Sequence, residues 1–164
     1  MIPRAAVSCA RAFENDAHIV SLISDKKKRA NLRYSFEFYM RGAIYGGSEA
    51  YATSELCEGI AIWYSSERKE PWDLVFRCGN PFLTLRCGFR FFWADMRANN
   101  LCKKLRDKLA PKPHMYLAAL GVDPSHQAKG CASALVKPML KRLDKSGTPC
   151  VLETHNSKNV DMYR

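Results

Sequence analysis

The apolar residues in the first half of the chain follow two different spacings. Residues 5–13 predict a short helix that ends near Asn15. A second helix is predicted by apolar residues at helical spacing and by the glycine pair that ends the pattern: Leu32, Phe36, Tyr39, Ala43, Gly46 and Gly47. Residues 50–53 and 59–65 predict the two strands of a hairpin, because the second segment is rich in isoleucine and aromatic residues.

The second half contains the stronger patterns. Residues 115–122 run without a charge, which predicts a strand buried on both faces. Residues 151–154 predict another strand, and 157–163 another helix. The helix between the two strands is indicated by apolar residues that recur at offsets of three and four: Ala132, Leu135, Val136, Met139, Leu140 and Leu143. This stripe outweighs the interruption by Pro138, so the unit is predicted to be a parallel strand–helix–strand crossover.

Residues 71–100 are harder to interpret, since prolines and glycines interrupt them and aromatic residues cluster near their end. We expect helices in this stretch. Leu101, Leu105 and Leu109 predict a further helix that stops before Pro111, with its lysines and arginines facing solvent.

Length and composition favour one folded domain over residues 1–164, since 47% of the residues are hydrophobic and can form a core. The formal net charge of +10 is uneven. Residues 1–82 hold 11 basic and 10 acidic side chains, and residues 83–164 hold 15 and 6. The basic half predicts a polyanionic partner, which charge alone leaves open between nucleic acid, a membrane surface and a phosphorylated cofactor.

The seven cysteines favour a reducing, cytoplasmic location. Their number is odd, and no C-x-x-C pair occurs, so neither a disulfide framework nor a zinc site is expected. No apolar run approaches the roughly 20 residues of a transmembrane helix, and the start of the chain lacks the apolar stretch of a secretory signal.

The turn between the uncharged strand and the following helix is the main candidate for chemistry. A helix N-terminus presents unpaired N–H groups and the positive end of the helix dipole, which together favour an anion. Gly130 would let the backbone approach a phosphate closely, and Lys129 adds positive charge. The segment 127–132 has neither the P-loop nor the dinucleotide-binding pattern, and an ordinary tight strand-to-helix turn remains an equal alternative on these residues alone.

Residues 117–163 as a whole resemble the GNAT superfamily of acyl-CoA-dependent N-acetyltransferases. The turn Gln127-Ala128-Lys129-Gly130-Cys131-Ala132 matches the Gln/Arg-x-x-Gly-x-Gly/Ala signature of that family. The later block, Leu-Glu-Thr at 152–154 and Asn156 to Tyr163, is similar to the puromycin N-acetyltransferase-like branch. The resemblance implies an α/β (α+β) fold with a GNAT-like mixed twisted sheet flanked by helices. It also implies a variable acceptor-side part at 1–113 and an acetyl-CoA-binding core at 114–164.

The resemblance also implies a role for particular residues, with acetyl-CoA as the co-substrate. The backbone of Leu120, Gly121 and Val122 would contact the pantetheine arm and the acetyl group. The pyrophosphate would be wrapped by Gln127, Ala128, Lys129, Gly130, Cys131, Ala132 and Ser133. Asn156 would contact the CoA arm, and Tyr163 would be the general acid.

The chemistry of acetyl transfer needs further groups. An amine must lose a proton before it attacks a thioester, which calls for a carboxylate or an ordered water. Glu153 is a candidate base, with a surface carboxylate at a strand end as the equal alternative. The N–H of Val122 is the candidate donor to the oxyanion, and no metal is expected.

The resemblance is incomplete at both ends, where the first strand and the last strands of the family are not seen. The sequence therefore predicts an open sheet edge at 151–154, through which a homodimer could form. We expect a small-molecule amine as acceptor, and neither a membrane nor a nucleic acid as partner. Two alternatives stay open: a non-catalytic CoA-binding remnant, and a basic module that binds nucleic acid or protein.

Overall fold

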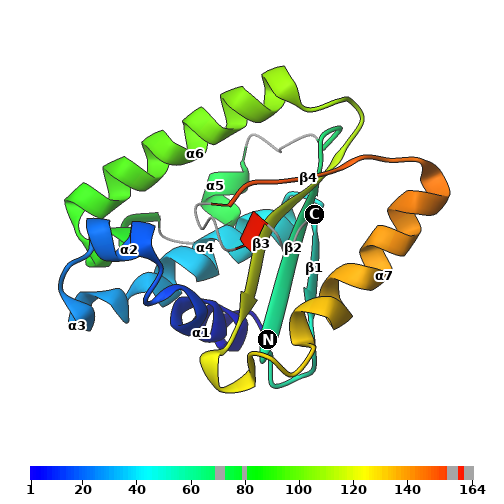
Figure 1. Cartoon of the computed structure of the whole chain (residues 1–164). Helices are drawn as coiled ribbons and strands as arrows, with labels where there is room; N and C mark the ends of the chain where they lie inside the picture. Colours follow the sequence, from blue (N-terminus) through cyan, green and yellow to red (C-terminus); the bar gives the residue numbers. More distant parts are fainter. Residues whose placement is uncertain (69–72, 79–80, 155–158, 161–164) are drawn as a thin grey trace.

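The computed structural model describes residues 1–68, 73–78, 81–154 and 159–160 (Figure 1). The elements follow in the order α1 (Ile2–Phe13), α2 (Ala17–Leu22), α3 (Lys26–Arg29), α4 (Leu32–Tyr45), β1 (Glu49–Ala52), β2 (Gly59–Ser65), α5 (Leu74–Arg77), the 3₁₀ helix η1 (Pro81–Cys87), α6 (Phe89–Leu109), β3 (Met115–Val122), the 3₁₀ helix η2 (Pro124–His126), α7 (Cys131–Ser146) and β4 (Cys150–Leu152).

The described strands form one mixed sheet in the order β1-β2-β3-β4. β1 and β3 run antiparallel to β2, whereas β4 runs parallel to β3. This arrangement confirms the predicted hairpin and the predicted crossover through α7. The fold class expected from the sequence, a mixed sheet flanked by helices, is confirmed as well.

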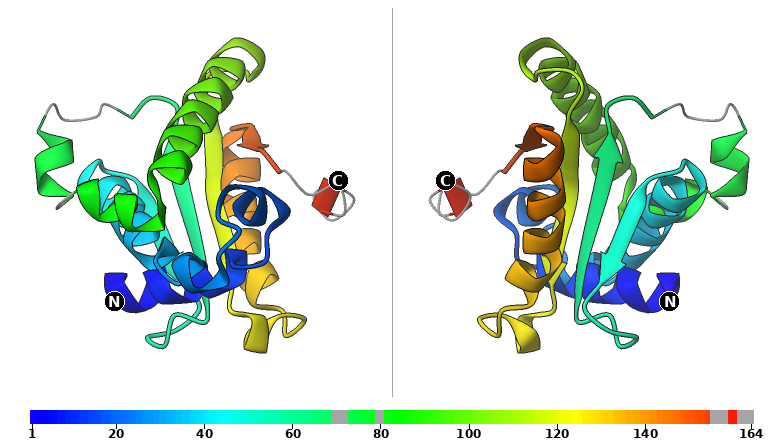
Figure 2. Two further views of the ribbon diagram at one scale, coloured as in Figure 1. Left: turned by 90° about the vertical axis from the view of Figure 1, so that its left-hand side faces the viewer. Right: turned by 90° about the vertical axis from the view of Figure 1, so that its right-hand side faces the viewer.

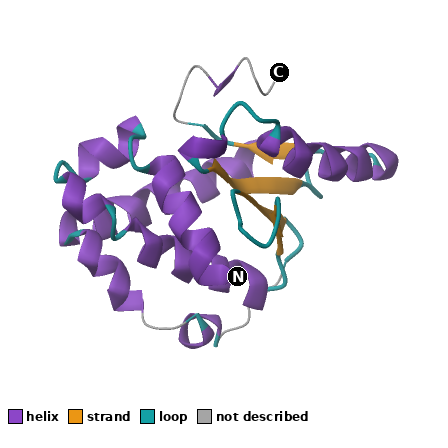
Figure 3. Cartoon of the chain, turned by 90° about the horizontal axis from the view of Figure 1, so that it is seen from below, coloured by secondary structure: helices purple, strands orange, loops and turns teal. Residues whose placement is uncertain are grey.

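Helices cover both faces of the sheet, and α4 and α7 lie on opposite faces (Figure 2). Because successive side chains of a strand point to opposite faces, β2 contributes to two cores. Ile60 and Ile62 pack with α1 and α4, while Ala61 and Trp63 pack with Leu135, Met139 and Leu143 of α7. Viewed from below, most helices gather on one side of the strands, and a single long helix extends on the other (Figure 3).

α7 is fixed at both ends and along its apolar stripe. Its flanking residues Gly130 and Gly147 both have a left-handed backbone, with φ of 81° and 63°. The stripe predicted from the sequence is buried at Leu135, Met139 and Leu143, and Pro138 lies within the helix. The sequence-based choice of the stripe over the proline is therefore confirmed.

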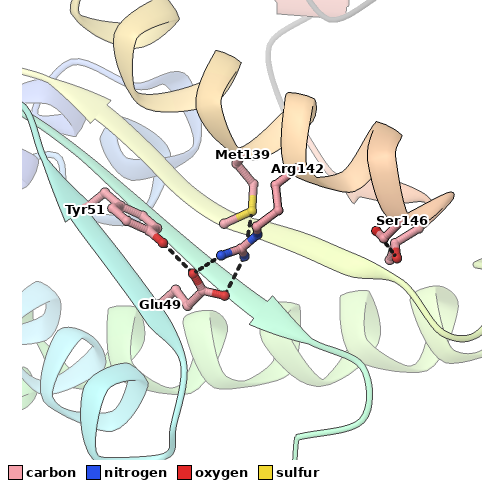
Figure 4. A network of polar contacts seen from close by, with 6 residues as sticks. Glu49, Tyr51, Met139, Arg142 and Ser146 are labelled. Carbon is pink, nitrogen blue, oxygen red and sulfur yellow. Dashed lines mark hydrogen bonds and ion pairs between the residues drawn. The ribbon is translucent and has the colours of Figure 1, made fainter.

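A polar contact links α7 to the far edge strand. Arg142 donates to both carboxylate oxygens of Glu49, at 2.6 and 2.9 Å, and Tyr51 donates to the same carboxylate (Figure 4). Nη2 of Arg142 also lies 3.0 Å from the sulfur of Met139. Half of the Arg142 side chain is exposed, so the contact orients the helix and adds little to stability.

The structure differs from the sequence analysis in several places. β3, which was expected to be buried on both faces, is mostly half-buried, and only Leu117 and Gly121 are buried. α6 is one helix of 21 residues, and the leucines expected to bury it, Leu101, Leu105 and Leu109, are exposed. The helix packs through a different face, on which Phe91 is buried and Arg106 is partly covered. The second strand of the crossover also ends earlier than predicted, at Leu152.

We predict that Trp63→Ala lowers the free energy of unfolding by about 3–5 kcal/mol, because the Trp63 side chain of β2 is fully buried against α7. Its indole N–H has no hydrogen-bond partner among the described residues. Trp63→Phe keeps an aromatic ring and removes that unpaired donor, so it should cost markedly less. Urea denaturation of both variants checks this, and equal losses would contradict the buried position of the ring.

Candidate functional site

A cavity of about 260 Å³ opens beside β3, where β4 ends. β3 is paired with β2 along its whole length, but β4 is paired with it only from Met115 to Leu117. Among the described residues, no strand covers the other edge of β3 from Ala118 onwards. The cavity lies along this edge, and α1, α2, α4 and α6 supply its remaining walls. It is bordered by backbone groups that can bind a ligand, as the unpaired edge of any strand can.

The turn after β3 is held by its own side chains. Asp123 accepts hydrogen bonds from the backbone N–H and the hydroxyl of Ser125, and forms an ion pair with Arg11 at 3.1 Å. Burial opposes the ionised form, yet the bonds from Ser125 and the charge of Arg11 keep the pKa of Asp123 below its ordinary value. A charged, buried carboxylate therefore fixes the point at which the chain leaves β3.

Two residues of the next turn adopt a left-handed backbone, Ala128 with φ 60° and Gly130 with φ 81°. A Cβ built at Gly130 would meet no atom within 4 Å, so the backbone there faces open space. α7 begins directly after it, with no acidic residue in its first turn. The free N–H groups of this turn, at Cys131, Ala132 and Ser133, face an open approach and fit an anion such as a pyrophosphate.

The structure gives each predicted turn residue a position. Nε2 of Gln127 donates to the carbonyl of Val122 at 3.2 Å, and Nζ of Lys129 donates to the carbonyl of Ser125 at 2.9 Å. Both side chains thus brace the turn. Cys131 is half-buried and does not belong to the buried core.

The predicted residues of β3 divide between two surroundings. Leu120 lines the cavity. Gly121 lies against α1, because a Cβ there would come within 3.4 Å of Phe13, Cys9 and Ala12. Asn156 and Tyr163, which the resemblance singled out, lie outside the described residues.

Glu153 lies directly after β4 on the cavity wall and is engaged by two partners. Nη1 of Arg106 lies 2.7 Å from one carboxylate oxygen, and the hydroxyl of Tyr116 donates to the other at 3.3 Å. The guanidinium of Arg106 also lies 3.6 Å from the centre of the Tyr116 ring. Burial and the charge of Glu153 raise the pKa of Tyr116 to about 12. Tyr116 therefore keeps its proton at neutral pH.

A second polar group in the cavity was not found from the sequence. Asp95 and Asn99 are neighbours on α6, and both line the cavity. Oδ2 of Asp95 accepts hydrogen bonds from the hydroxyl of Tyr39 and, at 3.2 Å, from Nδ2 of Asn99. Burial raises the pKa of Asp95, although the two donors oppose the shift. The i, i+4 spacing of Asp95 and Asn99 was the available signal, but nothing in the sequence places Tyr39 beside them.

The described residues contain no group of three or more histidine, cysteine or acidic side chains able to hold a metal ion. The seven cysteines are unpaired thiols. A helix long and apolar enough to cross a membrane does not occur in the described parts of the chain.

Comparison with known proteins points to one family. Residues 87–164 match the sequence model of the acetyltransferase (GNAT) family. A crystal structure described as histone acetyltransferase HPA2 and related acetyltransferase from Corynebacterium glutamicum matches this chain with a TM-score of 0.59. The two are 21% identical, and the match covers 99% of this chain and 76% of that chain. At this identity the likeness shows the fold.

The strained turn before α7 gives a prediction about stability. Gly130→Ala should lower the free energy of unfolding by about 1 kcal/mol, because a Cβ disfavours a left-handed backbone. Ala128→Gly removes such a Cβ and relieves the strain of a left-handed backbone, while the greater freedom of the unfolded chain offsets part of this gain. We therefore expect it to be neutral or to stabilise by about a few tenths of a kcal/mol. Denaturant titration measures both, and a stabilising Gly130→Ala or a clearly destabilising Ala128→Gly would contradict the backbone assigned to this turn.

Proposed function

We propose that this chain, whose residues 87–164 match the sequence model of the acetyltransferase (GNAT) family, transfers an acetyl group from acetyl-CoA to an amine held in the cavity beside β3. The observation that carries the proposal is the place of two sites on one strand. The open edge of β3 borders the cavity, and the anion-binding turn at Gly130 follows the end of the same strand. A ligand with a thioester at one end and a pyrophosphate further along matches this order.

The residues of the turn fit the cofactor. The N–H groups at the start of α7 would bind the pyrophosphate, and the backbone of Leu120, Gly121 and Val122 would hold the pantetheine arm. Bound acetyl-CoA supplies an activated acetyl group. The N–H of Val122 would stabilise the charge on the thioester oxygen, and Asn156 would contact the CoA arm.

A small-molecule amine is our preferred acceptor, in line with the puromycin N-acetyltransferase-like branch that residues 152–163 resemble. A reducing cytoplasm is the proposed location, and a homodimer through the edge at β4 is the proposed assembly. The rival functions are a CoA-binding protein without catalysis and a basic nucleic-acid-binding module. Titration of acetyl-CoA at several salt concentrations distinguishes the nucleic-acid-binding module from the other two functions, because binding to a nucleic acid weakens steeply with salt.

We predict that Gly130→Glu raises the Kd of acetyl-CoA about 5- to 150-fold, since it places bulk and negative charge where the pyrophosphate would lie. Gly147→Glu is the matched control. Gly147 also has a left-handed backbone and open space around its Cα, but it lies at the other end of α7. Isothermal titration calorimetry should show normal affinity for the control, and equal affinities in the two variants would remove the turn from the cofactor site.

We further predict that Tyr163→Phe lowers kcat about 100- to 10,000-fold and leaves the Kd of acetyl-CoA unchanged, because only the proton donor to the departing thiolate is lost. Acetyl transfer across a panel of amines, followed by mass spectrometry, measures kcat and identifies the acceptor. A variant with full kcat, when chemistry limits the rate, would make Tyr163 a packing residue.

A further inference from the structure

Three carboxylates line the cavity, and two of them are already committed to other contacts. Asp16 caps α2, because its side chain accepts hydrogen bonds from the backbone N–H groups of His18 and Ile19. Glu153 forms an ion pair with Arg106 at 2.7 Å. A carboxylate that is bound to a guanidinium holds its negative charge firmly and is a poor acceptor for a proton.

Asp95 differs from both because its hydrogen-bond partners are neutral. The hydroxyl of Tyr39 and the amide of Asn99 both donate to Oδ2, and Asn99 also donates to Tyr39. Oδ1 accepts no hydrogen bond from the described residues. The two donors hold Oδ2, and Oδ1 is left without a donor among the described residues, on a side chain that lines the cavity.

The rest of the cavity wall suits an organic cation. Phe13 and Phe36 line it as a stacked pair, with ring centres 5.4 Å apart, and the ring of Tyr116 lines it as well. No lysine or arginine is found among the described lining residues, although the whole chain has a net charge of +10. An ammonium group is attracted both to a carboxylate and to the faces of aromatic rings.

We propose that Asp95 binds the ammonium group of a cationic amine with an apolar or aromatic body, and then takes its proton as the general base of acetyl transfer. The base role rests on the proposed function, whereas the binding role does not. In the reaction the amine nitrogen forms a bond to the acetyl carbon, and the C–S bond of the thioester breaks. One proton of the ammonium group goes to Asp95 and later to water, and a second replaces the lost bond on the sulfur.

The groups around Asp95 set the pH at which it can act. Close to it lie His18 from α2, Tyr39 from α4 and Cys87 from η1. The other titratable groups that line the cavity are Asp16 at the start of α2, Cys102 on α6, Tyr116 on β3 and Glu153 after β4. Burial raises the pKa of Asp95 above the ordinary value for a carboxyl group. Because the base must be deprotonated, kcat/KM should rise as pH increases through this raised value. Loss of the Tyr39 hydroxyl, which favours the charged form, should move that rise to higher pH.

The binding role is tested without catalysis. Phenethylamine and its neutral isostere phenethyl alcohol are titrated into the full chain, and binding is followed by NMR chemical shifts. We expect the wild-type chain to prefer the amine at least tenfold, and Asp95→Asn to abolish that preference. Asp107→Asn, an exposed acid on the same helix, is the control and should keep it. An Asp95→Asn chain that still prefers the amine would overturn the proposal.

The base role is tested by kinetics with acetyl-CoA and the same amine. Asp95→Asn should lower kcat about 100- to 10,000-fold and remove the rise of kcat/KM with pH. Tyr39→Phe should keep the carboxylate active and shift the rise to higher pH. An active wild-type enzyme whose pH profile survives Asp95→Asn would overturn the base role, with Glu153→Gln then identifying the rival base. A wild-type chain that prefers the amine and acetylates nothing would instead refute the proposed function.

Discussion

The cavity on which the proposed function depends exists because β3 is paired unequally on its two edges. One edge of the strand is hydrogen-bonded to β2 from end to end, which fixes the strand in the sheet. Among the described residues, the other edge is paired only over its first three positions, because β4 ends at Leu152. A strand held on one side and open on the other offers rigid, unpaired backbone groups, and these are what an extended ligand with amide groups requires.

The position of α6 determines another wall of the cavity. Its exposed leucines show that this helix is not held by a continuous apolar stripe. It is held by Phe91 in a small core with α1, α2 and α4, and by polar contacts that reach Tyr39 on one side and Glu153 on the other. The walls of the cavity therefore depend on hydrogen bonds and an ion pair as well as on packing.

The sequence predicted those parts of the fold that local pattern determines. The isoleucine and aromatic residues of β2, the stripe of α7 and the glycine turn before it are each patterns of residues close together in the chain. The cavity could not be predicted in this way, since Tyr39 and Asp95 are 56 positions apart and Arg106 and Glu153 are 47 apart. The leucines of α6 led to a wrong prediction of the buried face, because helical spacing identifies a helix without showing which of its faces is buried.

The attachment of α7 has a consequence for the evolution of ligand affinity. The orientation of this helix is set by contacts along its length. Leu135, Met139 and Leu143 pack against the sheet, and Arg142 forms an ion pair with Glu49 of β1. Because the helix moves as one rigid body, a change of packing near its middle shifts the N–H groups at its N-terminus. Under the proposed function, the affinity of the turn for an anion can therefore change through substitutions in the core that never touch the anion, and selection for the ligand also acts on the hydrophobic interior.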